Sequence, residues 1–226
     1  MKWRAGRGPD RQLEDRLIWQ AASLLLDYPD EQFDRQLDAA EQILTHLPPD
    51  RTAGLMQVCR ELRAADRYAA ATAYVDTFDL RRRTTLLLTY WTAGDTRNRG
   101  REMLRFVEAY RGAGMTSPAG EAPDHLAVVL EFAATVDPQA GAELLAAFAV
   151  PIRTLRTGLE QAQSPYLPVL DAVCATLPVP STADEERAAR LAAAGPPAEA
   201  VGLEPFTLTV PPRRQAGESE RRKDVV

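Results

Sequence analysis

Apolar residues recur every three or four positions along most of this chain, which is the spacing that one face of an amphipathic helix requires. The first stripe consists of Leu13, Leu17, Ala21 and Leu24. We expect its helix to end before Pro29, because the residue preceding a proline is pushed out of the helical conformation. Similar stripes predict helices within residues 33–47, 55–62, 68–78, 97–110, 144–148, 152–159, 167–177 and 182–194. The chain is therefore predicted to be all-α.

Several helix starts can be placed by the residues that cap them. Pro123 suits the first position of a helix, because its missing N–H would have no partner there. This puts Asp124 in the first turn, where the helix dipole favours a carboxylate. Asp137 is the expected N-cap of the next helix, and Thr182 with Glu185 predicts a capping box for the last one.

The run from Leu86 to Trp91 can be interpreted in two ways. Its β-propensity alone would allow a strand. Its neighbours are predicted to be helical, however, and no second strand offers to pair with it. We interpret this run as a buried helix.

The composition changes after Gly195, where prolines interrupt any helix and residues 213–224 are highly charged. A segment with so little apolar surface to bury is typical of a mobile tail. We predict a flexible N-terminus at residues 1–10, a single compact helical domain at residues 11–194 and a flexible, proline-rich tail at residues 195–226. Within the tail, only Phe206 to Val210 shows an alternating pattern, and it could dock as an extended segment.

Charge and cysteine content narrow the classes of function. The 226 residues carry a formal net charge of −5, which argues against nonspecific binding to nucleic acid or to an anionic membrane. No apolar run approaches the roughly 20 residues that cross a bilayer, and residues 1–10 lack the apolar core of a secretion signal. Cys59 and Cys174 are isolated, so no disulfide framework is expected. A cytoplasmic protein is the default expectation.

Polar residues recur in the aromatic-rich stretch from Tyr74 to Phe132, yet they do not form an active site. No serine or cysteine motif accompanies His125 and no cluster of metal ligands forms, so we predict neither a catalytic residue nor a metal site. The turn at Gly94-Asp95 can direct Arg97 and Arg99 towards a carboxylate or a phosphate. This combination is typical of a docking surface.

The same residues also have structural interpretations, and the sequence leaves both open. The aromatic side chains are more often core than binding surface, and Arg82 or Arg83 could pair with Asp79 at a helix junction. Asp124 and His125 could contact a partner or only stabilise a helix start. If Asp124 contacts a partner, Asp124→Ala should leave the melting temperature nearly unchanged.

The order and spacing of these motifs resemble the nitrate reductase assembly chaperones. This family, also called the delta subunits or the NarJ type, belongs to the TorD-like redox-enzyme maturation chaperones. The resemblance covers roughly Leu13 to Leu177, and it departs from the family at Ala122, where relatives carry a larger apolar residue, and in the tail. Its motifs are Tyr74, Phe78-Asp79, Arg81 to Arg83, Gly94-Asp95-Thr96-Arg97, Arg99-Gly100, Pro123-Asp124-His125-Leu126 and Leu130-Glu131-Phe132. The partner-binding residues expected from it are Tyr74, Phe78, Asp79, Arg82, Gly94, Asp95, Arg97, Arg99, Asp124, His125, Leu126 and Glu131.

The resemblance implies a cytoplasmic, non-enzymatic chaperone. Such a protein binds the cofactor-free catalytic (alpha) subunit of respiratory nitrate reductase, including its N-terminal segment, and assists insertion of the molybdenum cofactor without joining the finished enzyme. It holds no permanent cofactor, and proteins of molybdenum cofactor biosynthesis are further candidate partners. Neither nucleic acid nor a membrane is expected as a partner. The alternatives are a chaperone for another molybdoenzyme of the superfamily, a helical nucleic-acid-binding regulator, and a helical enzyme or cofactor carrier.

Overall fold

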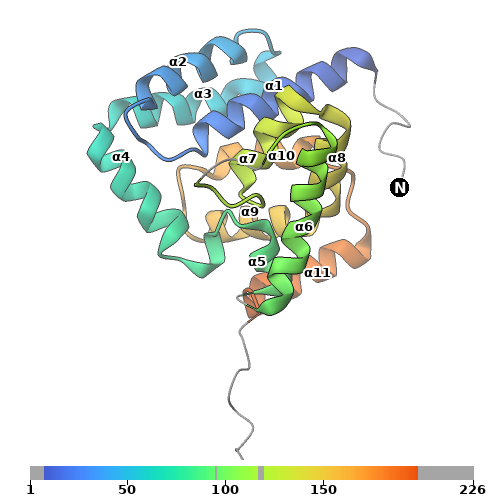
Figure 1. Cartoon of the computed structure of the whole chain (residues 1–226). Coiled ribbons are helices and arrows are strands. Elements are labelled where there is room, and N and C mark those ends of the chain that lie inside the picture. Colours follow the sequence, from blue (N-terminus) through green and yellow to red (C-terminus); the bar gives the residue numbers. More distant parts are fainter. Residues whose placement is uncertain (1–7, 95, 117–119, 198–226) are drawn as a thin grey trace, which may run out of the picture.

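The computed structural model describes residues 8–94, 96–116 and 120–197, which form an all-helical domain (Figure 1). The prediction of an all-α fold is confirmed, and the described residues contain no strand. The α-helices are α1 (Pro9–Leu25), α2 (Phe33–Leu44), α3 (Pro49–Ala64), α4 (Arg67–Tyr74), α5 (Leu88–Ala93), α6 (Arg97–Gly112), α7 (Leu126–Glu131), α8 (Pro138–Ala147), α9 (Ala149–Gln161), α10 (Leu167–Thr176) and α11 (Thr182–Ala194). Two π-helical turns, η1 (Val75–Asp79) and η3 (Phe132–Val136), continue α4 and α7, and η2 (Arg82–Thr84) is a 3₁₀-helix.

Helix α1 packs against four other helices: α2, α3, α7 and α10. Its Ile18 side chain is 1% exposed, and burying a side chain of this size contributes roughly 1.5–3 kcal/mol. Two buried hydrogen bonds fix α1 against its neighbours. Trp19 Nε1 donates to Thr176 Oγ1 of α10 at 2.8 Å, and Ser23 Oγ donates to the Ala127 carbonyl of α7 at 2.9 Å.

The apolar stripe predicted for α1 is only partly its buried face. Leu13 is 54% exposed, whereas Ala21 and Leu25 are buried together with Ile18 and Trp19. Because α1 has packing partners on several sides, its buried face is wider than a single stripe and is displaced from Leu13.

The segment from Leu86 to Trp91 differs from its predicted form at its start. Leu86 lies in a bend, Leu87 is extended, and α5 begins only at Leu88. Leu87 forms an isolated antiparallel bridge with His125, in which Leu126 N donates to Leu86 O at 2.9 Å and Leu88 N donates to Asp124 O at 3.0 Å. The helical interpretation is wrong for Leu86 and Leu87, because a distant segment supplies their backbone partners.

The same bridge moves the start of α7. The helix begins at Leu126 with His125 as its N-cap, so the prediction that Asp124 lies in the first helical turn is wrong. Pro123 and Asp124 instead form the turn that precedes the helix. The chain cannot be helical at Asp124 while the Asp124 carbonyl accepts a hydrogen bond from Leu88.

Two other caps were predicted. Asp137 caps α8, accepting hydrogen bonds from Gln139 N at 3.0 Å and Ala140 N at 2.9 Å, which confirms that prediction. The capping box of α11 is formed by Ser181 and Asp184, one residue earlier than the predicted pair of Thr182 and Glu185.

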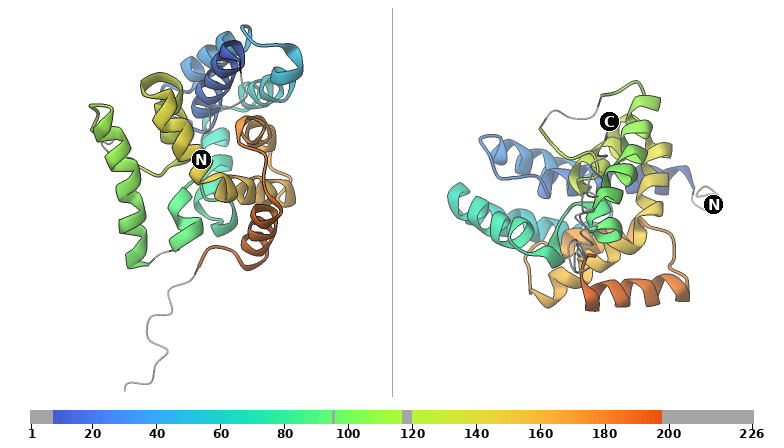
Figure 2. Two further views of the ribbon diagram at one scale, coloured as in Figure 1. Left: turned by 90° about the vertical axis from the view of Figure 1, so that its right-hand side faces the viewer. Right: turned by 60° about the horizontal axis from the view of Figure 1, so that its bottom comes forward.

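The last described residues fold back onto the domain at the end opposite α1–α3, where α11 lies along α9 (Figure 2). Gly195 and Pro196 are buried. Arg83 donates to the carbonyl oxygens of Ala192 and Ala193 at 3.0 and 2.9 Å, which holds the end of α11 beside η2. The first residues of the predicted tail are therefore packed, and the rest of that tail, residues 198–226, lies outside the described residues, as do residues 1–7.

None of the helices in the described ranges combines the length and apolar character that crossing a bilayer demands.

Candidate functional site

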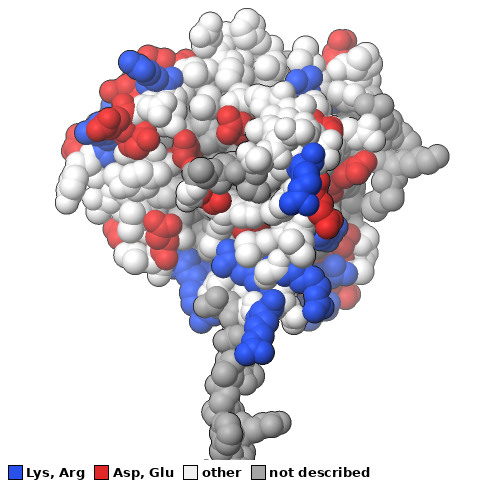
Figure 3. All heavy atoms as spheres, in the orientation of Figure 1, with Lys and Arg blue, Asp and Glu red and all other residues white. Residues whose placement is uncertain are grey.

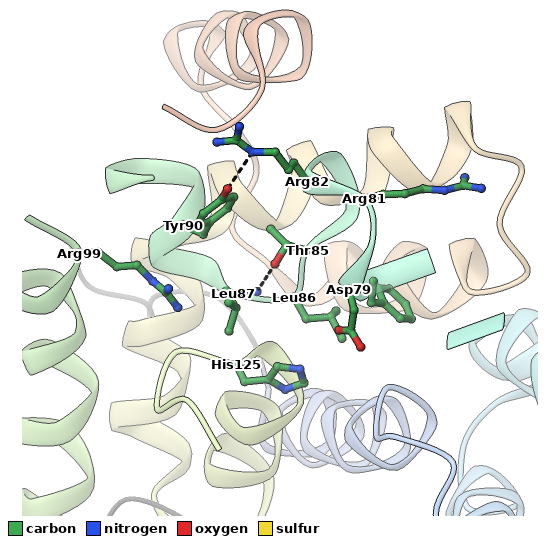
Figure 4. Close-up of a pocket in the computed structure, with 10 residues that line it drawn as sticks. Asp79, Arg81, Arg82, Thr85, Leu86, Leu87, Tyr90, Arg99 and His125 are labelled. Carbon is green, nitrogen blue, oxygen red and sulfur yellow. Dashed lines mark hydrogen bonds between the residues drawn. The ribbon is translucent and has the colours of Figure 1, made fainter. Parts of the chain in front are cut away.

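A pocket of about 340 Å³ opens where η1, the segment from η2 to α5, the first turn of α6 and the residue before α7 meet (Figure 4). We call it the junction pocket. Five of the predicted partner-binding residues line it: Phe78, Asp79, Arg82, Arg99 and His125. The other lining residues are Arg81, Thr85, Leu86, Leu87 and Tyr90.

The floor of the junction pocket is apolar and firmly supported. Phe78 and Leu86 are 3% and 2% exposed, so only a small part of each faces the pocket. The Phe78 ring lies 4.9 Å from the rings of Tyr74 and Tyr166, measured between centroids. Tyr74 is itself 5% exposed and donates a hydrogen bond to the Leu26 carbonyl at 3.1 Å. The structure therefore places Tyr74 behind the floor and not on the surface.

Phe78 and Asp79 reach the pocket from a π-helical turn, η1. Such turns are rare in proteins and occur frequently at functional sites. Here the turn places buried Phe78 in the floor and exposed Asp79 at the edge of the same pocket.

Two arginines approach Tyr90 from different sides (Figure 4). Arg82 Nε donates to the Tyr90 hydroxyl at 2.8 Å, and the Arg82 Cζ lies 5.7 Å from the ring centroid. The Arg99 Cζ lies 5.9 Å from the same centroid, within the range of a cation–π contact. The proposed pairing of Arg82 or Arg83 with Asp79 is wrong, because Arg82 contacts Tyr90 and Arg83 contacts α11.

Asp124 lies behind Arg99 and is 0% exposed. Its Oδ2 accepts hydrogen bonds from Thr89 N at 3.0 Å and Thr89 Oγ1 at 2.5 Å, and its Oδ1 lies 3.6 Å from Arg99 Nη2. Arg99 Nε also donates to Thr89 Oγ1 at 3.3 Å. A buried carboxylate is costly unless it is paired and hydrogen-bonded. In this structure Asp124 is not exposed to a partner, and it positions Arg99.

His125 lines the pocket as the N-cap of α7. Its Nδ1 atom is buried and has no hydrogen-bond partner among the described residues. Burial lowers the pKa of His125, and the nearby Asp124 carboxylate opposes this only in part. The imidazole is therefore neutral at pH 7.

Three carboxyl groups act electrostatically on Tyr74, which supports the floor of the pocket. Burial and then the charges of Asp79, Asp27 and Glu121, among others, raise the pKa of Tyr74. Of these three acids, only Asp79 lines the junction pocket. Burial also raises the pKa of each of the three carboxyl groups. None of them forms an ion pair with a described cation.

The remaining predicted residues lie elsewhere. Leu126 is 0% exposed in the core, and Gly94 ends α5 against the chain at Pro197. Arg97 is exposed at the first position of α6 but does not line the pocket. Glu131 lines a second hollow of about 240 Å³ beside η3, and Asp95 lies outside the described residues.

Five lining residues were not among the predicted site residues: Arg81, Thr85, Leu86, Leu87 and Tyr90. The β-propensity of the run that begins at Leu86 was the available signal, because its extended start is what brings Leu87 to His125. The pairing is a single bridge, so the segment around His125 has no strand pattern in the sequence that would reveal it.

The surface around the junction pocket is rich in arginine. Figure 3 shows Lys and Arg side chains gathered over the lower part of the molecule, where η2, α5 and the start of α6 lie, while Asp and Glu are more frequent above it. The arginines of this stretch are Arg81, Arg82, Arg83, Arg97, Arg99 and Arg101.

The described residues contain no group of three or more His, Cys, Asp or Glu side chains that could hold a metal ion. Burial raises the pKa of both Cys59 and Cys174 to about 11, so neither thiol is ionised at neutral pH. Ionisation is what makes a cysteine a nucleophile.

Comparison with known proteins identifies the family of this chain. A family model described as nitrate reductase delta subunit matches residues 30–172. The nitrate reductase-like protein NarX of Mycobacterium tuberculosis is 55% identical over 160 residues, which are 71% of this chain but only 24% of NarX. This chain thus spans about a quarter of the length of that relative.

Two further relatives are matched over more of their length. A Bacillus subtilis protein named probable nitrate reductase molybdenum cofactor assembly chaperone NarJ is 30% identical over 169 residues, or 74% of this chain and 90% of that protein. The nitrate reductase molybdenum cofactor assembly chaperone NarJ of Escherichia coli is 31% identical over 152 residues, or 66% of this chain and 64% of that protein. With more than half of its residues matched by the family model, the chain belongs to the nitrate reductase delta subunit family.

Proposed function

We propose that this chain is a chaperone that binds the cofactor-free catalytic subunit of a respiratory nitrate reductase in the cytoplasm. In this role it recognises the N-terminal segment of that subunit, assists insertion of the molybdenum cofactor and leaves before the enzyme is complete. The names of the relatives from Bacillus subtilis and Escherichia coli support an assembly role. The cofactor is cargo for the client, and proteins of cofactor biosynthesis would meet the chaperone bound to that client.

The observation that carries the proposal is the mixed lining of the junction pocket. Phe78 and Leu86 supply an apolar floor, Asp79 adds a carboxylate to the lining, and Arg82 and Arg99 add guanidinium groups. A short amphipathic segment offers matching apolar and charged side chains, as in helix-in-groove recognition. A micromolar dissociation constant corresponds to about −8 kcal/mol, which a few anchoring side chains can supply. Binding of that strength also permits release.

Co-purification tests the identity of the client. The tagged full-length chain is expressed in cells in which molybdenum cofactor synthesis is blocked, and the captured proteins are identified by mass spectrometry. We expect the nitrate reductase catalytic subunit to be captured under these conditions and to be lost once the cofactor is supplied. Capture that does not depend on the cofactor, or absence of this subunit, would contradict the proposal.

Calorimetry with a synthetic peptide that copies the N-terminus of the captured subunit tests the docking step. We expect measurable heat and a dissociation constant in the micromolar range. No heat at high micromolar peptide would remove the peptide-docking part of the proposal while leaving the client assignment to the co-purification.

A matched pair of variants tests the site. Asp79 and Asp76 are both exposed in η1, but only Asp79 lines the pocket. Asp79→Lys should weaken peptide binding severalfold, because it reverses a charge at the edge of the pocket. Asp76→Lys should leave binding unchanged, and equal effects of the two variants would place the peptide elsewhere.

A further inference from the structure

We propose that Arg82 and Arg99 form a carboxylate-binding subsite in the junction pocket, which selects client segments that carry an Asp or Glu side chain next to the apolar residue seated on the floor. This inference rests on the proposed function and adds the chemistry by which the pocket distinguishes one client segment from another. It makes the two arginines specificity-determining residues.

The first argument is that both guanidinium groups keep unused donors. A guanidinium has five N–H donors in a fixed fork. Arg82 uses Nε for the Tyr90 hydroxyl, and no described residue accepts a hydrogen bond from its terminal amino groups. Arg99 uses Nε for Thr89 Oγ1, and its ion pair with Asp124 is long at 3.6 Å. Both side chains line the pocket, so their free donors are available to an occupant.

The second argument is that the arginines are held in place before any ligand arrives. The Tyr90 ring lies within 6 Å of both Cζ atoms, at 5.7 and 5.9 Å. Behind Arg99, Thr89 and Asp124 are each 0% exposed, and Asp124 Oδ1 is buried without a hydrogen bond. Burying the Asp124 carboxylate costs free energy. We interpret this carboxylate as a support that orients the Arg99 guanidinium. Preorganised side chains lose less conformational entropy on binding.

The third argument concerns which anion fits. Asp79 lines the same pocket and the buried Asp124 lies behind Arg99, so these two negative charges would repel a phosphate with up to two charges more than a singly charged group. A peptide carboxylate carries a single charge and fits the arginine fork bidentately. Its neighbours along the peptide can be apolar or cationic, which suits the apolar floor and the Asp79 carboxylate. The mixed lining therefore favours a peptide side chain over a polyanion.

Calorimetry with the N-terminal peptide of the captured catalytic subunit tests the subsite. Arg82→Gln and Arg99→Gln should each weaken binding about tenfold or more, the loss expected for one charge-assisted hydrogen bond. Arg105→Gln is the matched control, because Arg105 lies on the same helix as Arg99 and its Cζ is 5.5 Å from the Phe148 ring, but it does not line the pocket. Binding by the control should equal that of the wild type.

Charge exchange identifies the partner of each arginine. Every Asp and Glu of the peptide is replaced in turn by Gln and by Lys. We expect that one of the peptides with a Gln substitution binds the wild-type protein weakly. Its affinity should not fall further when the protein carries Arg99→Gln. The peptide with Lys at that same position should bind the Arg99→Glu protein more tightly than it binds the wild type. A tightly binding peptide that contains no acidic residue would overturn the subsite.

The outcomes separate the two proposals. If the peptide binds and both glutamine variants bind it like the wild type, the subsite is wrong and the proposed function stands. If the peptide does not bind at all, the docking step of the proposed function fails first. Titration with inorganic phosphate and pyrophosphate covers the other source of oxyanions. Micromolar, arginine-dependent binding of pyrophosphate without an effect of the arginines on the peptide would assign the site to a small anion and overturn the proposal.

Discussion

Thr89 and Asp124 join the start of α5 to the turn before α7 through two hydrogen bonds that are completely shielded from solvent. The donors are the Thr89 backbone N at 3.0 Å and the Thr89 hydroxyl at 2.5 Å. Both residues are 0% exposed. Tyr90 follows Thr89 in the chain, His125 follows Asp124, and Arg99 contacts both members of the pair. Because Tyr90, His125 and Arg99 all line the junction pocket, the pair helps to set its shape.

Replacing Asp124 by alanine should therefore reduce stability, contrary to the expectation from the sequence that melting would be nearly unchanged. Asp124→Ala leaves Thr89 N and Oγ1 without their buried acceptor, so we expect a loss of about 2–4 kcal/mol in the free energy of unfolding. Urea denaturation followed by circular dichroism measures it. Asp137→Ala removes only a helix cap and should cost about 1 kcal/mol. A variant at position 124 with wild-type stability would show that this contact does not hold the pocket together.

Leu88 and Leu13 test which leucines form the core. Leu88 is 0% exposed at the start of α5, and Leu88→Ala should lower the free energy of unfolding by about 2–5 kcal/mol because it leaves a cavity. Leu13 is 54% exposed, so Leu13→Ala should change it by less than about 0.5 kcal/mol. The two urea denaturation midpoints give the comparison. Similar losses for both variants would mean that α1 is packed differently at its start.

Hydrophobic periodicity was sufficient to predict the helices, because a helix that packs on one side repeats its apolar residues with its own period. It failed at Leu86 and Leu87, where single backbone hydrogen bonds to a distant segment decide the conformation. The β-propensity of the run from Leu86 allowed an extended start, but nothing in the sequence identified the segment that pairs with it. The shift of α7 to Leu126 is the other half of the same contact.

The site was predictable in part for a related reason. Exposed polar residues such as Arg82 and Asp79 have little structural need for their position, and both line the pocket. Tyr74 and Leu126 turned out to be core, since an aromatic or leucine at helical spacing has the same sequence pattern whether it faces the core or a groove. Asp124 is buried because Thr89 provides donors, and no sequence motif announces that pairing.

Gly94 should resist substitution because of both its backbone and its neighbour. Its φ of +61° lies in the region that favours glycine, and an added Cβ would lie 2.0 Å from the Pro197 carbonyl oxygen. Gly94→Ala should therefore destabilise the chain by more than about 1 kcal/mol and displace the residues that follow α11. Gly100 lies within α6 with open space around it, and Gly100→Ala should stabilise by about 0.5–1 kcal/mol. The melting temperature should fall in Gly94→Ala and rise in Gly100→Ala. A higher melting temperature for Gly94→Ala would contradict the close approach of Pro197.

His125 should make the domain less stable as the pH falls through the mildly acidic range. Because burial lowers its pKa in the folded state, the unfolded chain takes up a proton near pH 6.5 while the folded chain does so only at lower pH. Between these two values the unfolded state binds more protons, so the free energy of unfolding decreases as the pH falls. Within the pocket, His125 is accompanied by Asp79, Arg82 and Arg99, and Asp124 adjoins it.

Two measurements check this sign. NMR titration should give His125 a pKa below 6.5. Urea denaturation at a series of pH values should show a smaller loss of stability below pH 6.5 in His125→Gln than in the wild type, because glutamine has no proton to take up. A pKa at or above 6.5, or an unchanged pH dependence in the variant, would mean that a partner missing from the described contacts stabilises the charged imidazole.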